Sequence, residues 1–542
     1  MIPLSGDETA GENRPIRSHR FPITSPSVAR SSPKARIIKS IAVALVPYIR
    51  RKLFISRHYP PGPKGLPILG NLFQLSQTPW VPFTQWKEEY GEIVYLNVLG
   101  QPIIVLNSVK TATDLLDRRS RIYSDRPKSV VGNDMLSGGM NIALLSYTPM
   151  LRKLRRISHE GLSKRASNNY QPFRIREVVQ LLRSLVKEPK AWRSHVEKSG
   201  VYLTLSILYG LPKSDEEREW AIENLNTFIA RMTYTLAPGN YLAEFIPFMK
   251  YLPSSIAKWK GEVLQWSKES TEFYQKLYKS GRDNFKDGGL VGNLSKAIYQ
   301  EQSRYSVSDD YASWLMAILY VAGAETSQTQ VAWLILAMAK YQDVQERAQE
   351  ELDAVVGRSR MPTLEDIERL PYIQATVKEV LRWVPPAPVG LPHAASKDDW
   401  YNGYFIPKGT LCIFNLWGIH RDKELFGLDA DEFNPSRFLD EHGQISLSPK
   451  LWDSTKGEGH VGFGFGKRIC PGRYIAEDNL HLTVANLLWA LKIRPKSASV
   501  PNPINNYHFN GVILQPKVID CDFIPRFPEL DTILEHAADH CQ

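Results

Sequence analysis

Apolar residues recur with the spacing of a helix along most of this chain, and strand-like patterns are few. Two short runs, residues 93–98 and 102–106, flank a turn and predict a β-hairpin. Helical patterns then continue as far as Trp383. A second strand-like region covers residues 401–414, and residues 510–514 look like a further hairpin turn. The pattern therefore predicts a mainly α fold with a smaller β-rich side.

An apolar stretch, residues 314–338, is interrupted by six consecutive polar residues, 325–330. The stretch is long enough for a buried helix, but burying an unpaired carboxylate or hydroxyl at its centre is costly. The interruption also argues against a membrane span, which needs about 20 mostly apolar residues. Glu325 and Thr326 are therefore candidate catalytic residues, and a polar patch at a helix–helix contact is the alternative. Gly323, just before them, permits a local widening of the helix.

One cysteine stands in a glycine-rich loop that reads F-x-x-G-x-R-x-C-x-G, with the fixed positions Phe463, Gly466, Arg468, Cys470 and Gly472. Metals bind the thiolate form of cysteine, which nearby donors and positive charge favour. Glycines let backbone N–H groups approach the sulfur closely because they lack a Cβ. The apolar run after the loop has helical spacing, so a helix would direct its positive end towards Cys470. The loop predicts a metal ligand, and an ordinary buried cysteine in a turn is the alternative.

Two further motifs lie upstream of this loop. Glu379 and Arg382 are three residues apart, so they share a helix face and can form an ion pair. The segment 433–438 supplies a second arginine, Arg437. Two guanidinium groups would satisfy both oxygens of one buried carboxylate. We expect these three residues to form a structural network, although an isolated pair is more often a solvated surface contact.

Together, and in this order, the motifs resemble the haem-thiolate monooxygenases of the cytochrome P-450 superfamily, and the resemblance covers residues 60–530. It implies the P-450 fold, a haem cofactor and Cys470 as the axial ligand of the haem iron. The other four fixed positions of the cysteine loop would help to bind the haem. Glu325 and Thr326 would guide protons during oxygen activation. The Glu379 network would lock the connection that leads to the cysteine loop.

Two more positions match family residues that contact the haem propionates. Arg155 corresponds to a propionate-binding cation, although this chain has Leu151 where the family usually has tryptophan. His393 corresponds to a position that often contacts the other propionate, and an ordinary loop histidine is the alternative. The resemblance also implies which residues line the substrate cavity. These are residues 130–145, Leu319, Ala322 and Ala324, residues 387–391 and residues 509–513.

The resemblance implies a monooxygenase that uses O2 and NADPH-derived electrons to insert one oxygen atom into a small apolar substrate. Segments 124–127 and 390–410 look like fungal enzymes of secondary metabolism, which suggests a terpenoid, a polyketide or an aromatic alkaloid. No G-x-G-x-x-G stands between a strand and a helix, so a separate NADPH-cytochrome P-450 reductase would supply the electrons. A reductase-independent isomerase or dehydratase and a non-catalytic haem-binding protein are the alternatives.

Composition fits an intracellular globular enzyme. The hydrophobic content is 43% and the charged content 23%, both ordinary for a folded protein. The four cysteines show no paired spacing, which argues against a disulfide framework and a zinc site. Length alone would suggest several domains, but the motif order implies one catalytic domain over residues 60–530 and a tail, 531–542.

The positive charge is concentrated near the N-terminus. Residues 1–58 hold eleven Lys and Arg against three acidic residues, which is +8 of the net +10, so no nucleic-acid partner is expected. The leader, residues 1–59, is predicted to combine a disordered basic part with a short apolar run, residues 40–49. That run is too short to span a membrane as a helix.

The leader therefore predicts association with a membrane surface through apolar residues and flanking cations. We expect the cytosolic face of the endoplasmic reticulum. A mitochondrial location is the alternative, because an acid-poor leader rich in Ser and Arg can also be a transit segment. A second apolar segment, residues 245–253, could dip into the membrane near the cavity entrance, or it could be a packed loop between helices.

Overall fold

The computed structural model describes residues 58–210, 214–237, 239–283, 292–497 and 503–539. The chain divides into two compact units, Met1–His58 and Tyr59–Gln542, and the described helices and strands belong to the second. The leader's predicted apolar run lies outside the described residues. Among the helices of the described part, none is long and apolar enough to cross a membrane.

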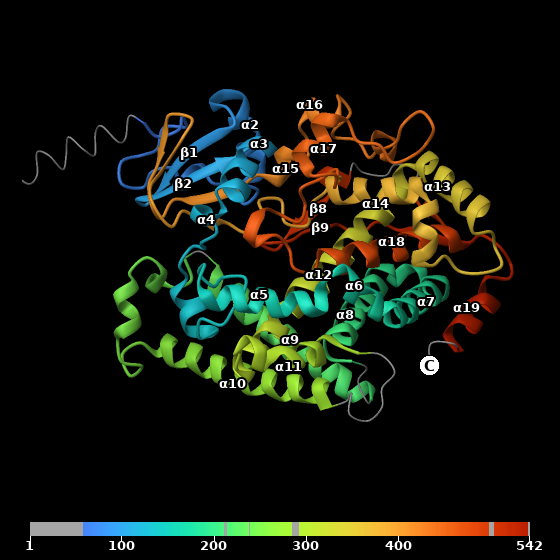
Figure 1. Ribbon diagram of the computed structural model, residues 1–542, viewed down its shortest axis with the longest axis horizontal. Helices are drawn as coiled ribbons and strands as arrows, with labels where there is room; N and C mark the ends of the chain where they lie inside the picture. The colour runs from blue at the N-terminus through green and yellow to red at the C-terminus, as the bar shows by residue number, and fades with distance from the viewer. Residues whose placement is uncertain (1–57, 211–213, 238, 284–291, 498–502, 540–542) are drawn as a thin grey trace, which may run out of the picture. The chain divides into compact units, whose positions relative to one another are not determined.

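Helices make up most of this second unit. The sheet that contains β1 and β2 lies at one side of it, whereas β8 and β9 lie near its centre (Figure 1). The α-helices are α2 (Trp80–Tyr90), α3 (Val109–Ala112), α4 (Ser120–Tyr123), α5 (Pro149–Leu162), α6 (Lys164–Ser167), α7 (Gln171–Lys187), α8 (Trp192–Tyr209), α9 (Asp215–Leu236), α10 (Lys258–Asp283), α11 (Leu294–Tyr305), α12 (Asp309–Lys340), α13 (Gln342–Val355), α14 (Pro371–Trp383), α15 (Leu416–Ile419), α16 (Lys423–Phe426), α17 (Pro449–Thr455), α18 (Arg473–Ala490) and α19 (Leu530–Asp539). The strands are β1 (Ile93–Val98), β2 (Gln101–Leu106), β3 (His393–Ala394), β4 (Asp399–Tyr401), β5 (Tyr404–Ile406), β6 (Leu411–Phe414), β7 (Leu491–Pro495), β8 (Tyr507–Phe509), β9 (Leu514–Pro516) and β10 (Cys521–Pro525).

Short helical turns of other types join these elements. The π-helical turns are η2 (Thr113–Arg118) and η3 (Val130–Leu136). The 3-10 turns are η1 (Leu72–Gln74), η4 (Asn168–Tyr170), η5 (Pro189–Ala191), η6 (Leu242–Glu244), η7 (Pro247–Tyr251), η8 (Leu364–Arg369), η9 (Pro435–Phe438), η10 (Gly466–Arg468) and η11 (Pro503–Asn505).

The β-rich side is built around a four-stranded sheet of order β1-β2-β6-β3. β1 and β2 form the antiparallel hairpin that the sequence predicts, with Ile93 opposite Leu106. Gly100 takes a positive φ of 87° in its turn, a conformation that glycine adopts without strain. β6 pairs in parallel with β2 and antiparallel with β3. The sheet thereby holds β3, which carries His393, at its edge.

α12 is the central helix of the α-rich part. Its residues 312–318 and 329–339 are buried on every side, because α8, α10 and α18 pack against it. This burial explains why the stretch is apolar without one polar face. The helix is α-helical from end to end, so the widening that Gly323 permits is not present. A Cβ at Gly323 would lie 3.1 Å from Thr204, so the glycine instead lets α8 approach α12 closely.

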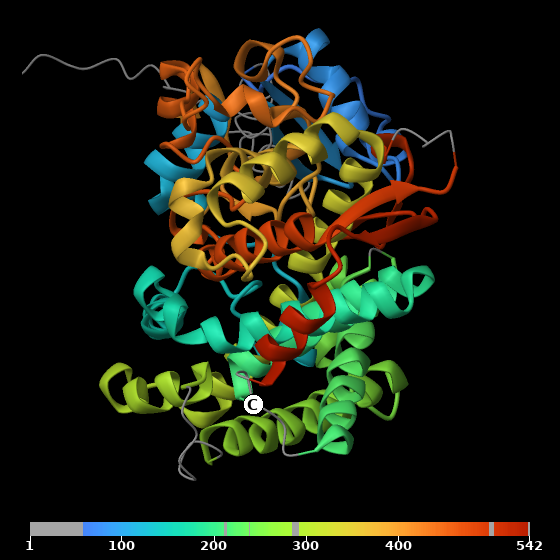
Figure 2. The same ribbon diagram turned by 90° about the vertical axis from the view of Figure 1, so that its right-hand side faces the viewer.

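Two large apolar clusters meet along α12. In one, Trp314 packs edge-on against Tyr274, with ring centroids 5.0 Å apart. In the other, Trp333 packs edge-on against Trp383 at 6.1 Å. The polar residues 325–330 belong to neither cluster. In Figure 2 the teal helices of residues 149–209 lie below the orange-red α18, which packs against α12 and α7.

Candidate active site

Cys470 lies in a tight loop between η10 and α18. Its backbone N–H donates to the carbonyl of Phe463 (N···O 2.9 Å), which closes the loop. Gly466 has a φ of +55°, and a Cβ there would lie 2.2 Å from the carbonyl oxygen of Leu116. Only glycine fits this close approach. Gly472 is the N-cap residue of α18, so the helix begins three residues after the cysteine, at Arg473.

The thiol of Cys470 is buried and lies near positively charged side chains. Burial raises the pKa of the thiol, while the N–H of Gly472 and the guanidinium groups of Arg155 and Arg473 oppose this shift. The net effect is a pKa of the Cys470 thiol above its ordinary value. A metal ion bound to the sulfur would lower the pKa of the thiol instead, because a coordinated thiol is fully deprotonated. The site therefore suits a metal ligand better than a free thiolate.

Cys470 opens into a cavity of about 240 Å³. The apolar lining is Ile142, Ala143, Ile318, Leu319, Ala322, Ala387, Gly390, Leu391, Phe414, Leu416, Gly462, Phe463, Gly464, Phe465 and Pro471. The polar lining is Arg126, Arg155, His393 and Arg468. Three of the four segments that the sequence assigns to a cavity wall thus contribute to it. Ala324 is instead buried against the core, and residues 509–513 are not among the lining residues.

Among the polar residues that line the cavity, Arg126 is the one that the sequence does not single out as a site residue. Its Nε donates to the carbonyl of Ala143 (3.0 Å), and its Nη1 donates to those of Leu391 and Pro392 (2.7 Å each). The side chain thereby joins two of the loops that form the cavity wall. The only sequence signal is its position in the segment 124–127, and a single loop arginine is normally solvated.

The other two arginines also hold loop carbonyls. Arg155 donates through Nη2 to the carbonyl of Ile469, next to the cysteine. Arg468 donates through Nε to the carbonyl of Ser124 (2.8 Å) and through its Nη atoms to two further carbonyls of residues 142–145. Each guanidinium group therefore binds neutral oxygens on one side and faces the cavity on the other.

These cations repel one another. Burial, followed by the charges of Arg468 and Arg155, lowers the pKa of Arg126 to about 9. Burial and Arg155 lower that of Arg468 to about 10. Burial and Arg126 lower the pKa of His393 to about 3, and its Nδ1 lies 2.6 Å from the carbonyl oxygen of Tyr123. A ligand that brings carboxylates into the cavity would relieve this repulsion, and the two propionates of a haem fit the donor set.

Glu325 and Thr326 lie on α12 but are not among the residues that line this cavity. They follow the lining residue Ala322 by three and four positions, so they share its helix face. The hydroxyl of Thr326 donates to the carbonyl of Ala322 (2.8 Å). The carboxylate of Glu325 instead accepts from the side-chain amides of Asn510 and Gln515. Burial raises the pKa of Glu325, while these two amides oppose the shift.

Glu379 receives both expected arginines. Arg382 donates through Nε and Nη2 to the two carboxylate oxygens at 2.7 Å, and Arg437 donates through Nε at 3.1 Å. The side chains of Glu379 and Arg382 are 0% exposed, and that of Arg437 is 7% exposed. Arg437 also pairs with Asp429, a partner that the motifs do not reveal. The geometry is that of a buried network and differs from a solvated surface pair.

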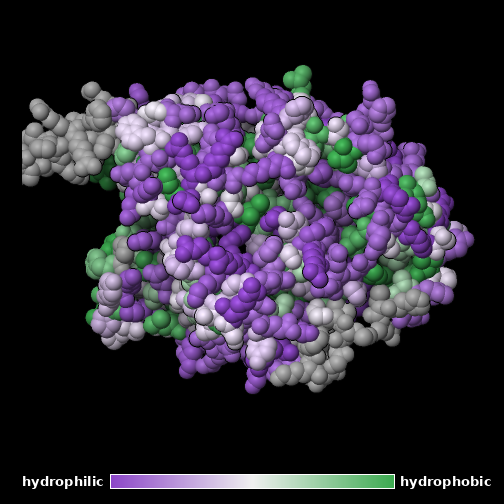
Figure 3. Space-filling view, in the orientation of Figure 1, coloured by the Kyte–Doolittle hydropathy of each residue, from purple (hydrophilic) through white to green (hydrophobic). Residues whose placement is uncertain are grey.

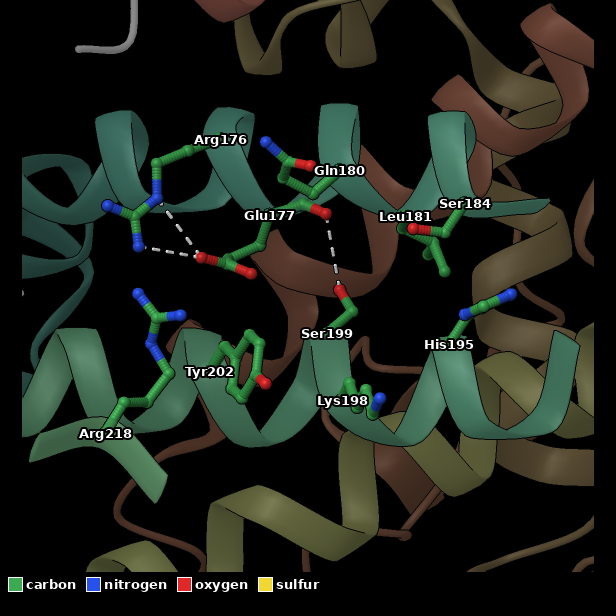
Figure 4. Close-up of a pocket in the computed structure, with 10 residues that line it drawn as sticks. All are labelled: Arg176, Glu177, Gln180, Leu181, Ser184, His195, Lys198, Ser199, Tyr202 and Arg218. Carbon is green, nitrogen blue, oxygen red and sulfur yellow. Dashed lines mark hydrogen bonds and ion pairs between the residues drawn. The ribbon is translucent and has the colours of Figure 1, made fainter. Parts of the chain in front are cut away.

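A larger cleft, of about 420 Å³, lies between α7 and α8 (Figure 4). Its floor holds the buried Glu177, which accepts from Nε and Nη2 of Arg176, and Lys198 and Arg218 also line it. It shares no lining residue with the cavity at Cys470. The chemistry that the motifs predict therefore belongs to the smaller, apolar cavity.

Comparison with known proteins identifies the family. The model of the cytochrome P450 family matches residues 60–523. This chain belongs to the cytochrome P450 family. It is 44% identical to a cytochrome P450 monooxygenase of Armillaria gallica over 483 residues, which cover 88% of this chain and 93% of the relative. It is 40% identical to cytochrome P450 monooxygenase 58 of Postia placenta over 513 residues, covering 94% and 96%. It is 37% identical to cytochrome P450 monooxygenase iboC of Amanita muscaria over 554 residues, covering 94% and 97%.

Family membership establishes the general chemistry. The P450 is an oxidoreductase with a haem cofactor that a cysteine thiolate ligates, and P450 monooxygenases work with a redox partner and an organic substrate. The helix-rich architecture with small sheets is the P450 fold. Of the cysteines in the described part of the chain, Cys470 alone lines the cavity, while Cys412 and Cys521 are buried elsewhere.

Proposed function

We propose that this P450 inserts one oxygen atom from O2 into a small apolar substrate of secondary metabolism, such as a terpenoid, a polyketide or an aromatic alkaloid. One observation carries the proposal. Cys470, the guanidinium groups of two buried arginines and one half-buried arginine, and an apolar wall meet in a single cavity. Ile318, Leu319 and Ala322 supply that wall from α12, and none of them can pair with a charged substrate.

In this proposal Cys470 would ligate the haem iron, and Arg126, Arg155, Arg468 and His393 would hold the propionates. Bound haem would supply oxygen activation, with electrons from an NADPH-cytochrome P450 reductase. The arginines already bind loop carbonyls, so their free N–H groups are oriented before any carboxylate arrives. Phe463, Gly466 and Gly472 keep the cysteine loop in the shape that presents the sulfur to the cavity.

Glu325 and Thr326 are proposed to handle protons. Both follow the cavity face of α12, and Glu325 is the carboxylate of this helix nearest to Ala322 in sequence. Burial raises the pKa of Glu325, so this carboxyl binds a proton more readily than an exposed glutamate does. The hydroxyl of Thr326, anchored to the carbonyl of Ala322, keeps its lone pairs available as a proton acceptor.

Expression with a reductase, in a host fed candidate pathway intermediates, tests the proposal. The expected result is a product that has gained one oxygen atom by mass spectrometry, and whose formation requires NADPH. Cys470→Ala should abolish both the product and the red-shifted absorption band of the reduced, CO-treated protein. Retention of that band would refute Cys470 as the ligand. Turnover without NADPH and reductase would indicate an isomerase or dehydratase instead.

We further propose that the P450 associates with the cytosolic face of the endoplasmic reticulum. The segment around η6 and η7 exposes several large apolar side chains. These are Leu242 (62% exposed), Phe245 (53%), Phe248 (68%), Tyr251 (77%) and Ile256 (72%). Figure 3 shows apolar residues at the edge of this face where the segment lies. Such exposure is not expected of a loop packed between helices, and a patch of this kind favours a membrane surface.

Flotation with phospholipid vesicles tests this association. Deleting residues 1–58 should weaken binding, because the leader holds +8 of the net charge. Changing Phe248 and Tyr251 to serine should weaken it further, whereas serine at the exposed Leu428 (88%) should not. Equal flotation of all variants would contradict the proposed surface.

A further inference from the structure

The carboxyl of Glu325 is held by a hairpin that is distant in sequence. Asn510 donates from Nδ2 to Glu325 Oε1 (2.8 Å), and Gln515 donates from Nε2 to the same oxygen (2.7 Å). Asn510 lies in the turn between β8 and β9, and Gln515 lies on β9. Both distances lie within the ordinary range of N–H···O hydrogen bonds.

The turn fixes the direction in which Asn510 donates. Its Oδ1 accepts the backbone N–H of Val512 (3.1 Å) and of Ile513 (2.8 Å). Because the oxygen is committed to these two donors, the amide nitrogen must face the other way, towards Glu325. Gly511 takes a φ of +99°, which completes the turn. The donor is therefore oriented by backbone contacts that do not depend on the acid.

The hairpin is also anchored to the helix that carries the acid. Trp333, two turns after Glu325 on α12, donates from Nε1 to the carbonyl of Leu514 (3.0 Å). The N–H of Leu514 donates to the carbonyl of Pro386 (2.8 Å). Gln515 follows Leu514 directly, so its amide cannot move far from Glu325 while these bonds persist.

Both amides donate to the same carboxyl oxygen of Glu325, Oε1, and leave Oε2 to carry the proton. Oε1 of Glu325 accepts the two bonds whether or not the group is ionised, so Oε2 can gain or lose a proton without releasing the hairpin. The charged groups that act on the carboxyl are Arg193 and Glu197, both on α8. Arg193 is itself bound to Glu197, through Nε at 2.6 Å, so the two largely offset each other. The amides are therefore the main specific contacts of Glu325.

We propose that Asn510 and Gln515 are positioning residues for proton transfer by Glu325. They hold the carboxyl in one place, three residues after the cavity residue Ala322, while a proton leaves Oε2 and is replaced from solvent. This inference rests on the proposed proton-handling role of Glu325. It assigns the turn of residues 509–513, which the sequence places in the substrate wall, to the support of the acid.

Gln515→Met tests the inference, because methionine keeps the length of the side chain but donates no hydrogen bond. Asn510→Asp is the second variant, since it keeps the oxygen that caps the turn and loses the donor. Lys517→Ala, an exposed residue of the same hairpin, is the matched control. Haem content and the CO-bound absorption band establish that each variant is folded and loaded.

The first measurement is the pH titration of Glu325 by infrared spectroscopy of the haem-loaded, substrate-free protein, with Glu325→Gln to identify its carboxyl band. Neutral donors favour the ionised carboxyl, so losing one should move the midpoint to higher pH. Gln515→Met should show this shift through loss of the donor alone. Asn510→Asp should show it through loss of the donor and through repulsion by the new carboxylate, and Lys517→Ala should not show it. An unchanged midpoint in the folded variants would overturn the inference, and so would loss of the fold in both, which would make the amides merely structural.

The second measurement is the hydrogen peroxide released per NADPH oxidised by the P450 and its reductase, without substrate. Both variants should change this yield in the same direction as Glu325→Gln. If Glu325→Gln leaves the yield unchanged, the proposed role of Glu325 fails and the positioning role fails with it. If Glu325→Gln changes the yield and the amide variants do not, the role of Glu325 stands and the inference about the hairpin is refuted.

Discussion

Replacing Glu379 with alanine should destabilise the folded protein by about 3–5 kcal/mol, the cost of removing one partner from a buried ion pair. Arg437 would keep the carboxylate of Asp429. Arg382 would keep three backbone carbonyls but no carboxylate, although its side chain is 0% exposed. The size of the effect is therefore set by one buried guanidinium group without a counter-charge.

This free energy converts into a modest change in melting temperature, because the folded unit is large. An unfolding entropy of about 2.1 cal/mol/K per residue gives about 1 kcal/mol/K for the roughly 480 residues of Tyr59–Gln542. A loss of about 3–5 kcal/mol should then lower the Tm by about 3–5 °C. Circular dichroism of the haem-loaded protein measures this shift, and absorbance measures the haem bound per chain.

Asp429→Asn provides the matched control. Asp429 also contacts Arg437, but its side chain is 44% exposed, so the loss should stay below about 1 kcal/mol and about 1 °C. Two results would refute the reasoning. One is a Tm and a haem content of Glu379→Ala that equal those of the parent protein. The other is an equal effect of the two substitutions, which would mean that burial does not decide the energy.

Three further predictions follow from the cavity and its surroundings. Arg126→Met should reduce the haem bound per chain, whereas Arg152→Met, at an exposed position of α5, should not; equal haem contents would contradict a propionate role for Arg126. Thr326→Ala should retain haem and NADPH oxidation but release more hydrogen peroxide per NADPH, and an unchanged yield would mean that the hydroxyl is structural. Burial, followed by the charge of Glu458, raises the pKa of Glu477 from 4.5 to about 7. The folded state then binds more protons than the unfolded state, so this carboxyl lowers stability progressively as pH rises from about 4.5 to about 7. Glu477→Gln should gain Tm relative to the parent protein over that window, and a constant difference across pH would contradict the shift.

Residues that contact their own neighbours in sequence, or that belong to a motif, could be predicted. The spacing of Glu379 and Arg382 predicts a shared helix face, and the bidentate pair in the structure follows from it. The loop motif predicts a glycine at position 466. The steric reason, the close approach of the Leu116 carbonyl, appears only in the structure. Asp429 could not be found in the same way, because an acidic residue in a loop is usually solvated.

Polar contacts between distant segments were the part that the sequence could not supply. Arg126 reaches carbonyls at positions 143, 391 and 392, and nothing in the residues around it specifies those partners. The sequence predicts a hairpin turn near residues 510–514, but it does not predict where that turn lies in the molecule. An Asn-Gly pair predicts local geometry, whereas the contact with Glu325 depends on how β9 is anchored to α12.

In the proposed haem site, the three cavity arginines would link the cofactor to the fold. Arg155 holds the carbonyl next to Cys470, Arg468 holds the segment after α4, and Arg126 holds the loop before β3. Each loop is thus tied to a cation whose charge is not neutralised by the carbonyls it binds. Propionates would neutralise that charge and strengthen the same contacts, because a guanidinium group relieved of repulsion is less costly to bury. Haem binding should therefore stabilise the loops that enclose the haem. Replacing any one of these arginines with an uncharged residue should reduce both haem occupancy and the order of the cavity wall.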